Sequence, residues 1–281
     1  MGKFDGVLLT SDLDNTLIHT EPCLRTGTPV PPLSAGNREA LEYFMAQGGR
    51  FSVATGRALA AYLPVAQLVP VNAPCVICNG AAIYDLAAGE YLDFALLNEA
   101  VRPRVQQVLE AFPTVAVEAY HIDNVIHTVH PNDITRRHAH MTKVTTTECA
   151  SMREVPLPLG KLLLEEERPV LEQAAAFIRD RGWGGDYELI FSGGTLLELT
   201  DKGASKGGMV LRLSRRLGIA REHIYCVGDE ANDISMLTAA KEGFAPANCA
   251  QAVKDAGATI VSDKNHDALA DVIAKLEQYY T

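Results

Sequence analysis

Two aspartates, Asp12 and Asp14, stand one residue apart where the short apolar run 6–11 gives way to polar residues. Two carboxylates this close repel each other, so burying both is costly unless a cation offsets them or one of them holds a proton. The pair therefore indicates a divalent metal site, a division of acid and base roles, or both. Taken alone, segment 11–17 is equally typical of a solvated turn rich in Asp, Asn and Thr.

A second acidic segment, 228–233, follows the apolar run 224–227. Asp229, Glu230 and Asp233 supply carboxylate oxygens, and Asn232 supplies an amide oxygen. Mg²⁺ prefers oxygen ligands of this kind, and the segment contains no Cys or His that would favour another metal. By itself, the segment is also compatible with an acidic loop that caps the next helix.

Thr55, Gly56 and Arg57 follow a predicted strand and precede a predicted helix. A hydroxyl and a guanidinium donate to phosphate oxygens, and a glycine lets backbone N–H groups approach an anion at the start of the helix. These residues therefore form a candidate phosphate cradle. In isolation, an ordinary strand-to-helix turn with a capping threonine explains them as well.

Lys206 begins a predicted helix, 205–217, whose apolar residues face the core. The N-terminus of a helix favours anions over cations, so a lysine there is best explained if it points at carboxylates or a phosphate in a shared site. Lys202, four residues earlier, is interpreted as a solvated surface residue.

These motifs lie at the ends of predicted strands of one parallel sheet. Strands are predicted at 6–12, 50–55, 74–78 and 224–228, with helices between them on the faces of the sheet, which is the α/β class. Because the carboxyl ends of parallel strands meet at one edge, we expect the polar groups to lie together. Residues 18–34 are predicted to be a long loop, because they contain Pro22, Gly27, Pro29, Pro31 and Pro32.

Between these strands lies an insert with a different pattern. Strands are predicted at 114–119, 124–129, 161–165, 187–192 and 196–200, and helices at 99–112 and 168–180. Antiparallel pairs plus helices describe an α+β domain. The sequence therefore predicts a discontinuous core, 1–84 and 201–281, and an inserted domain, 85–200.

The formal net charge of −10 makes nucleic acid an unexpected partner, although a local cation still permits a small anionic substrate. We expect a cytoplasmic protein without membrane association, since the chain shows neither a signal-peptide pattern nor an apolar stretch of about 20 residues.

Six dispersed cysteines argue against a disulfide framework, and Cys75 and Cys78 are interpreted as buried core. The histidines of the insert are expected at surface and strand positions rather than in a metal site: His121, His127, His130, His138 and His140.

Taken together and in this order, the motifs resemble those of the haloacid dehalogenase (HAD) superfamily of phosphohydrolases: D-x-D-x-T at 12–16, the hydroxyl at Thr55, Lys206, and G-D-x-x-N-D at 228–233. Thr-Gly-Arg at 55–57, Asn-Gly at 79–80 and Ser-Lys-Gly at 205–207 resemble the Cof-type (type IIB) branch. The resemblance implies a Rossmann-like parallel sheet with helices on both faces and an inserted, mobile α+β cap, which coincides with residues 85–200.

The resemblance also implies roles for individual residues. Asp12 is the expected nucleophile and Asp14 the expected general acid and base. Mg²⁺ is the expected cofactor, held by the carboxylates of Asp12 and Asp229 and the backbone carbonyl of Asp14, with Asp233 and Asn232 in support. Six residues are expected to act in catalysis or to bind phosphate: Thr55, Gly56, Arg57, Asn79, Lys206 and Asn232. Arg57 and Asn79 are expected either to bind phosphate or to position the cap.

The implied function is a Mg²⁺-dependent phosphatase that hydrolyses small phosphorylated metabolites, with sugar phosphates as the expected class, through an aspartyl-phosphate. A phosphotransferase or mutase of the phosphomannomutase kind is the first alternative, and accumulation of free phosphate distinguishes the two. The second alternative is a non-catalytic binding protein, against which the intact set of motif residues argues. The substrate and the oligomeric state are left open by the sequence.

Overall fold

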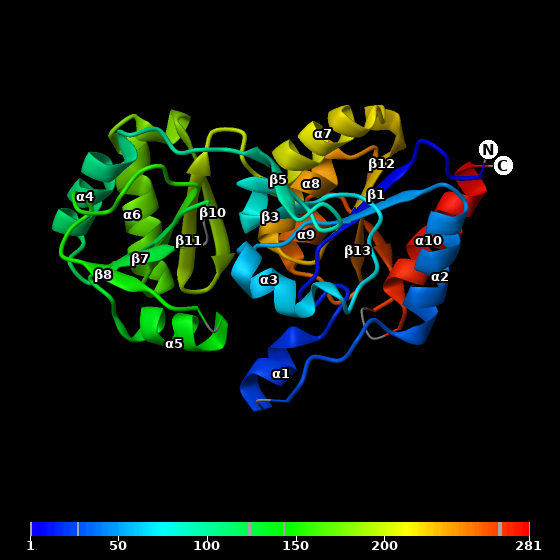
Figure 1. Cartoon of the computed structure of the whole chain (residues 1–281), viewed down its shortest axis with the longest axis horizontal. Coiled ribbons are helices and arrows are strands. Elements are labelled where there is room, and N and C mark those ends of the chain that lie inside the picture. Colours follow the sequence, from blue (N-terminus) through cyan, green and yellow to red (C-terminus); the bar gives the residue numbers. More distant parts are fainter. Residues whose placement is uncertain (1, 27, 123–124, 143, 264–265, 281) are drawn as a thin grey trace.

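The computed structural model describes residues 2–26, 28–122, 125–142, 144–263 and 266–280. They form two lobes (Figure 1). We call the part comprising residues 97–201 the cap lobe and the remainder the core lobe.

The core lobe is built on a parallel sheet with the strand order β14-β13-β12-β1-β2, of which Figure 1 labels β13, β12 and β1. The strands are β1 (Leu8–Ser11), β2 (Arg50–Val53), β12 (Ile224–Val227), β13 (Glu242–Pro246) and β14 (Thr259–Val261). Ser11, the last residue of β1, is in register with Val53 of β2 and Val227 of β12. The segments that follow these strands therefore leave the sheet at the same edge, as the sequence predicts.

A small antiparallel sheet, β3-β4-β5, continues beside β2, because Ala54 bridges Val76 in parallel. Its strands are β3 (Cys75–Ile77), β4 (Ala82–Asp85) and β5 (Glu90–Phe94). The predicted boundary before residue 85 falls inside the hairpin of β4 and β5. Since Tyr91 and Phe94 of β5 pack on the core cluster, the packing favours a boundary after residue 95.

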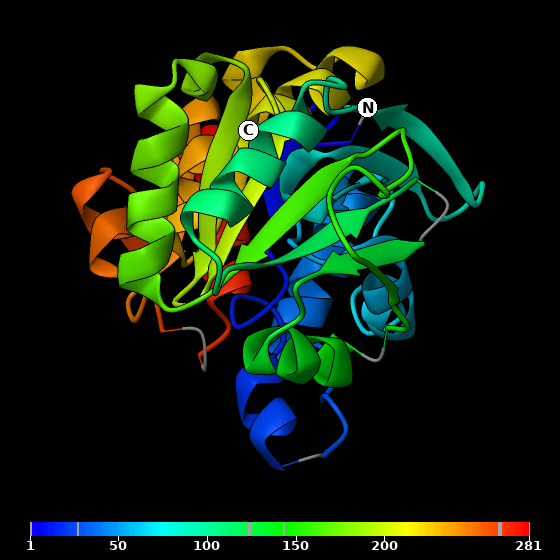
Figure 2. The same cartoon turned by 90° about the vertical axis from the view of Figure 1, so that its left-hand side faces the viewer.

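The cap lobe contains a six-stranded sheet in the order β10-β11-β9-β6-β7-β8. Its strands are β6 (Ala116–Tyr120), β7 (Ile126–Val129), β8 (Thr147–Cys149), β9 (Lys161–Glu165), β10 (Tyr187–Gly193) and β11 (Leu196–Asp201). Helices α4 (Val101–Ala111) and α6 (Arg168–Asp180) cover the face away from the core lobe (Figure 2). The opposite face therefore looks toward the core lobe.

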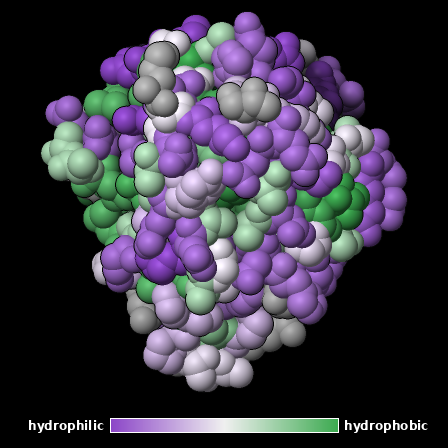
Figure 3. All heavy atoms as spheres, turned by 90° about the vertical axis from the view of Figure 1, so that its right-hand side faces the viewer, coloured by the Kyte–Doolittle hydropathy of each residue, from purple (hydrophilic) through white to green (hydrophobic). Residues whose placement is uncertain are grey.

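The end of the core lobe far from the cap is mostly hydrophilic, with small scattered apolar patches (Figure 3). In the part of the chain that the structure describes, none of the helices combines the length and the apolar character needed to span a bilayer.

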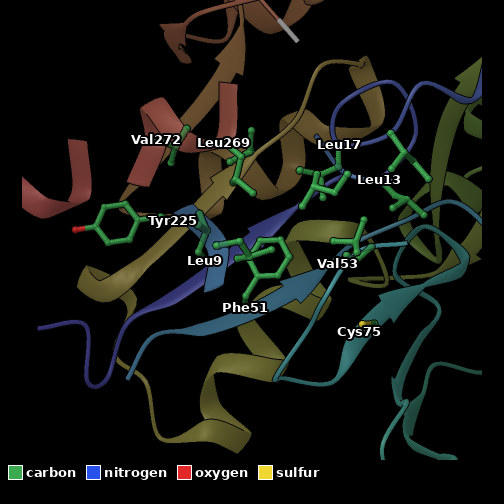
Figure 4. Packing of buried hydrophobic residues seen from close by; sticks show 14 of the residues in the cluster. Leu9, Leu13, Leu17, Phe51, Val53, Cys75, Tyr225, Leu269 and Val272 are labelled. Carbon is green, nitrogen blue, oxygen red and sulfur yellow. The ribbon is translucent and has the colours of Figure 1, made fainter. Parts of the chain in front are cut away.

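Each face of the core sheet carries its own apolar cluster. Leu9, Phe51 and Tyr225 pack toward α2 (Ala35–Ala46) and α10 (Ala268–Tyr279), as Figure 4 shows for part of this cluster. Neighbouring strand residues point to the other face, where they meet α7 (Lys206–Leu217) and α8 (Ile234–Ala239). Burial on both faces explains why these strands are continuous apolar runs in the sequence.

The structure contains several elements that the sequence prediction lacks, among them two helices. Within the predicted loop 18–34, residues Thr20–Thr26 form helix α1. Pro22 lies in the first turn of this helix, where a missing N–H costs no intrahelical hydrogen bond. Helix α5 (Asp133–Thr142) was not predicted, because Thr135 is its one buried residue and it has no apolar stripe. The remaining helices are α3 (Leu59–Ala66) and α9 (Gln251–Asp255).

Candidate active site

Asp12 lies directly after β1, where its backbone N–H donates to the carbonyl of Val227 at 2.8 Å. Lys206, the first residue of α7, reaches this carboxylate: its Nζ donates to Asp12 Oδ1 at 2.5 Å and to Asp233 Oδ1 at 2.6 Å. Asp12, Lys206 and Asp233 are all buried. The expectation that Lys206 points at carboxylates in a shared site is therefore met by its geometry.

The charges at this centre shift each other's pKa values. Burial raises the pKa of Asp12 well above its ordinary value; Lys206 opposes this shift, while Asp233 and Asp229 add to it. Burial alone would lower the pKa of Lys206, but the two carboxylates that it contacts raise it above its ordinary value. Lys206 is therefore a permanent cation, and a further positive charge beside Asp12 would stabilise the ionised carboxylates.

Asp233 is fixed by the loop after β12. Its Oδ2 accepts hydrogen bonds from the backbone N–H groups of Asp229 and Glu230, each at 3.0 Å, and its Oδ1 accepts from Lys206. Gly228 permits this close turn, because a Cβ there would lie 2.4 Å from the Cβ of Asp233. With both oxygens engaged, Asp233 supports the site more readily than it could bind a metal.

Asp229 stands opposite Asp12. Its Oδ1 accepts a hydrogen bond from the hydroxyl of Thr16 at 2.6 Å. Carboxylate oxygens of Asp12, Asp229 and Asp233 lie within 4.8 Å of one another. Three buried carboxylates against one ammonium leave net negative charge, and an all-oxygen donor set fits a hard divalent cation such as Mg²⁺.

Arg57 holds Asp14 rather than standing free for a phosphate. Its Nε and Nη2 donate to the two carboxylate oxygens of Asp14 at 2.8 and 2.7 Å, and its Nη1 donates to the carbonyl of Ala61 at 2.9 Å. The backbone N–H of Arg57 donates to the hydroxyl of Thr55 at 3.2 Å. The Thr-Gly-Arg segment is therefore joined to the Asp-x-Asp segment by a bidentate ion pair.

Asn79 connects the core lobe to the cap lobe. It adopts a positive φ of 53° two residues after the end of β3. Its Nδ2 donates to Glu198 Oε1 of β11 at 2.6 Å, and its Oδ1 accepts from Asn232 Nδ2 at 3.0 Å. Gly56 leaves room for this side chain, because a Cβ there would lie 2.9 Å from Asn79 Nδ2.

A pocket of about 360 Å³ opens between the two lobes at these residues. Of the residues predicted for the site, its wall contains Asp12, Asp14, Gly56, Arg57, Asn79, Asp229 and Asn232. Thr55, Lys206 and Asp233 do not line the pocket and are buried. The structure thus brings all ten predicted residues to one region, seven of them on the pocket wall.

The cap residues that line the pocket were not predicted as site residues from the sequence. They include Tyr120, His138, Lys161 and Glu198. Lys161 and Glu198 form a buried ion pair at 3.0 Å. A signal was present, because both are charged residues inside apolar strand segments, and such residues are seldom buried without a partner.

The prediction for the cap histidines is wrong at one position. His138 lies on α5 with its side chain mostly buried against the cap sheet, where its Nδ1 is 3.0 Å from Glu118 Oε2. His130 and His140 are exposed, and His127 lies on β7, as predicted. The predictions for the cysteines are confirmed: all six are free, and Cys75 and Cys78 are buried.

Comparison with known proteins identifies the class. The model of the haloacid dehalogenase-like hydrolase family matches residues 9–273. The chain therefore belongs to the haloacid dehalogenase-like hydrolases, which confirms the resemblance seen in its motifs.

Individual relatives cover nearly the whole chain. The chain is 26% identical over 281 residues to pyridoxal phosphate phosphatase YbhA of Escherichia coli (strain K12), with 95% of this chain and 97% of that protein covered. A haloacid dehalogenase-like hydrolase structure from Bacteroides thetaiotaomicron is 24% identical, with a TM-score of 0.75 and coverage of 96% and 99%. A subclass IIB sugar phosphatase is 20% identical, with a TM-score of 0.77 and coverage of 96% and 98%. These structural likenesses show the fold.

Proposed function

We propose that this hydrolase is a Mg²⁺-dependent phosphatase of small phosphate monoesters that works through an aspartyl-phosphate on Asp12. The observation that carries the proposal is the position of Asp12, buried against Lys206 and at the same time part of the pocket wall. A carboxylate nucleophile divides phosphoryl transfer into two easier steps, transfer to the enzyme and hydrolysis. Lys206 offsets negative charge at the centre where the phosphoryl group would be transferred.

Asp12 and Asp229 are the residues that would hold Mg²⁺, together with the backbone carbonyl of Asp14. This choice is supported by the engagement of both Asp233 oxygens in hydrogen bonds. When bound, the ion neutralises charge on the phosphoryl oxygens and lets the anionic substrate approach the carboxylates. Thr55 and Lys206, which are buried just beneath the pocket wall, would orient the phosphoryl oxygens when the phosphoryl group reaches Asp12.

Asp14 would protonate the leaving alkoxide and later accept the proton of the attacking water. In the structure Arg57 occupies both oxygens of this carboxylate. Proton transfer therefore requires one of these hydrogen bonds to be exchanged for one to the substrate. Arg57 would thus position Asp14 until a substrate enters.

The leaving group would occupy the cap side of the pocket, beside Tyr120 and Lys161. A volume of about 360 Å³ is at the small end of the usual range for ligand pockets, which supports a small metabolite. The named relatives act on different phosphate esters, pyridoxal phosphate and a sugar phosphate, so we include both kinds among the substrates to be tested.

The test is phosphate release from sugar phosphates, nucleotides and cofactor phosphates, measured with Mg²⁺ and with EDTA. We expect Mg²⁺-dependent release by the wild type and its loss in Asp12→Asn. Asp255→Asn, at an exposed position on α9, is the matched control and should remain active. Release that persists in a folded Asp12→Asn variant would rule out the aspartyl-phosphate. Exchange between sugars without free phosphate would support the mutase alternative.

A further inference from the structure

A second group of metal-ligand residues lies in the cap lobe, outside the Asp12 centre. Glu118 of β6 and Glu165 of β9 are fully buried, and the side chain of His138 on α5 is 17% exposed. Because Glu118 pairs with Leu163 in register, it shares a sheet face with Glu165, two residues further along β9. His138 Nδ1 lies 3.0 Å from Glu118 Oε2 and 3.3 Å from Glu165 Oε1.

Most of the carboxylate oxygens in this group have no hydrogen bond. Within the described part of the chain, Glu118 Oε1 and both oxygens of Glu165 are buried without a hydrogen-bond donor. The hydroxyl of Thr135 lies beside Glu165 and donates to Asn132 Oδ1 at 3.2 Å. Buried carboxylate oxygens without partners are costly, so these two side chains require an additional cation or proton.

The neighbouring lysine does not meet this requirement. Lys161 Nζ pairs with Glu198 Oε2 at 3.0 Å and donates to the carbonyl of Gly56 at 3.4 Å. Its positive charge is therefore matched by Glu198. Glu118 Oε2 also accepts a hydrogen bond from the hydroxyl of Tyr120 at 2.5 Å, which adds no charge. Glu118 and Glu165 therefore share the imidazole of His138, and the group is net negative whenever both are ionised.

We propose that Glu118, His138 and Glu165 bind a divalent transition-metal ion of the Zn²⁺ class. Ligand atoms bonded to Zn²⁺ at about 2.0–2.2 Å lie about 3.3–3.6 Å apart in a tetrahedron. His138 Nδ1 lies 3.0 and 3.3 Å from the two carboxylates, and the three ligand atoms lie within 4.8 Å of one another, so small shifts would bring them to these separations. An imidazole nitrogen among the ligands favours Zn²⁺ over Mg²⁺, so the cap site and the oxygen-only core site would select different ions.

The location of this site places a bound ion beside the substrate pocket. Three protein ligands leave the fourth position of a tetrahedral ion open. His138 also lines the pocket between the lobes, so an ion bound there would border the space for the leaving group. The site itself does not depend on the proposed phosphatase activity.

The test is titration of metal-free protein with Zn²⁺ in saturating Mg²⁺, followed by calorimetry, with Co²⁺ absorption as a second readout. We expect the wild type to bind one equivalent of Zn²⁺ at the cap. Glu165→Gln and His138→Gln should each weaken this binding at least tenfold, while Asp229→Asn in the core should retain it. Circular dichroism checks that each variant is folded.

Two controls address other zinc-binding groups. His127→Gln removes the pair formed by His121 Nε2 and His127 Nδ1, which are 2.9 Å apart, and Cys149→Ser removes the one half-buried thiol among the six cysteines. Both variants should bind Zn²⁺ as the wild type does. The proposal is overturned if the wild type binds no Zn²⁺, or if binding survives in Glu165→Gln and His138→Gln. X-ray absorption of the zinc-loaded wild type, which needs no variant, should show nitrogen and oxygen ligands; sulfur ligation would also overturn it.

Discussion

The molecule holds two buried groups of carboxylates, one in each lobe, and they are stabilised by different cations. In the core, Lys206 contacts both Asp12 and Asp233, and backbone N–H groups satisfy the remaining oxygen of Asp233. In the cap, Glu118 and Glu165 face His138, and three of their four oxygens have no hydrogen bond within the described part of the chain.

The core group is preorganised by a permanent cation, whereas the charge of the cap group changes with pH. A lysine whose pKa is raised stays charged across the physiological range, so the core group keeps its cation throughout that range. A histidine changes its charge near neutral pH, and the carboxylates around it then lose or gain a partner. We therefore expect the core group to govern the chemistry and the cap group to respond to metal and protons.

The largest effect is expected when the core cation is removed. Lys206→Met leaves Asp12 and Asp233 buried without their ammonium, which costs about 3–5 kcal/mol of stability. Phosphate release should fall at least a thousandfold, and the Tm should drop. The control is Lys202→Met, which removes an exposed lysine paired with Glu188. A folded Lys206→Met variant with a tenth of the wild-type rate would contradict the role of this cation.

A smaller effect, which depends on the leaving group, is expected at Asp14. Asp14→Asn should lower kcat/KM, which reports transfer to Asp12 and not the later hydrolysis, by about 10²–10⁴ for alkyl phosphates, because the alkoxide then leaves without a proton. The loss should be much smaller for p-nitrophenyl phosphate, whose leaving group needs no protonation. Asp186→Asn is the matched control, since Asp186 is also paired with an arginine, Arg104, at 2.6 Å. Equal losses for both esters would argue against acid catalysis by Asp14.

A cap substitution at the pocket should change binding more than chemistry. Glu198→Gln weakens the ion pair with Lys161 and the hydrogen bond from Asn79, so we expect KM to rise about tenfold with a small change in kcat. Steady-state kinetics on the best substrate measures both constants. Glu188→Gln, on the neighbouring strand β10, should leave both unchanged. A fall in kcat at constant KM would instead place Glu198 in the chemical step.

The smallest effect is the pH dependence of stability in the cap. Burial, together with Glu118, raises the pKa of Glu165 from 4.5 to about 7, although Thr135, His138 and Lys161 oppose the shift. The folded state therefore binds this proton more tightly than the unfolded state, and the stability gained is full below pH 4.5 and is lost as pH rises through about 7. The pKa of His138 is also raised, because Glu118 and Glu165 outweigh its burial, and its contribution has the same sign.

We expect the Tm of the wild type, measured in EDTA, to fall by a few degrees relative to Glu165→Gln between pH 4.5 and 8. Added Zn²⁺ should reverse this trend, since metal ligands must be deprotonated. A Tm difference that is constant with pH would show that Glu165 does not titrate in this range.

Much of the core could be predicted from the sequence, because its strands are buried on both faces and end in polar motifs. This pattern alone predicts that Asp12, Thr55 and Asp229 lie at one sheet edge. Lys206 could be assigned to the same site because a cation is unfavourable at a helix N-terminus unless it contacts an anion. The pairing of Arg57 with Asp14 could not be predicted, because either a phosphate or a carboxylate satisfies a guanidinium.

The cap was harder to predict for a physical reason. Its sheet buries apolar residues on one face and charged residues on the other, and the charged face is stabilised by contacts between distant segments. Lys161 pairs with Glu198, and Glu118 meets His138 of a helix that has one buried residue. No local pattern specifies such partners, so α5 and the cap wall became evident only in the structure.

The contacts of Asn79 have a consequence for turnover. This side chain binds Asn232 within the core lobe and Glu198 of the cap lobe, and the cap's Lys161 contacts the carbonyl of Gly56 nearby. Separation of the lobes at the pocket would break the two contacts to the cap but leave Asn79 held by Asn232. The amide of Asn79 would then keep its position and be ready to bind Glu198 again when the lobes close. The strength of this hydrogen bond would therefore help to set how quickly product leaves and the next cycle begins.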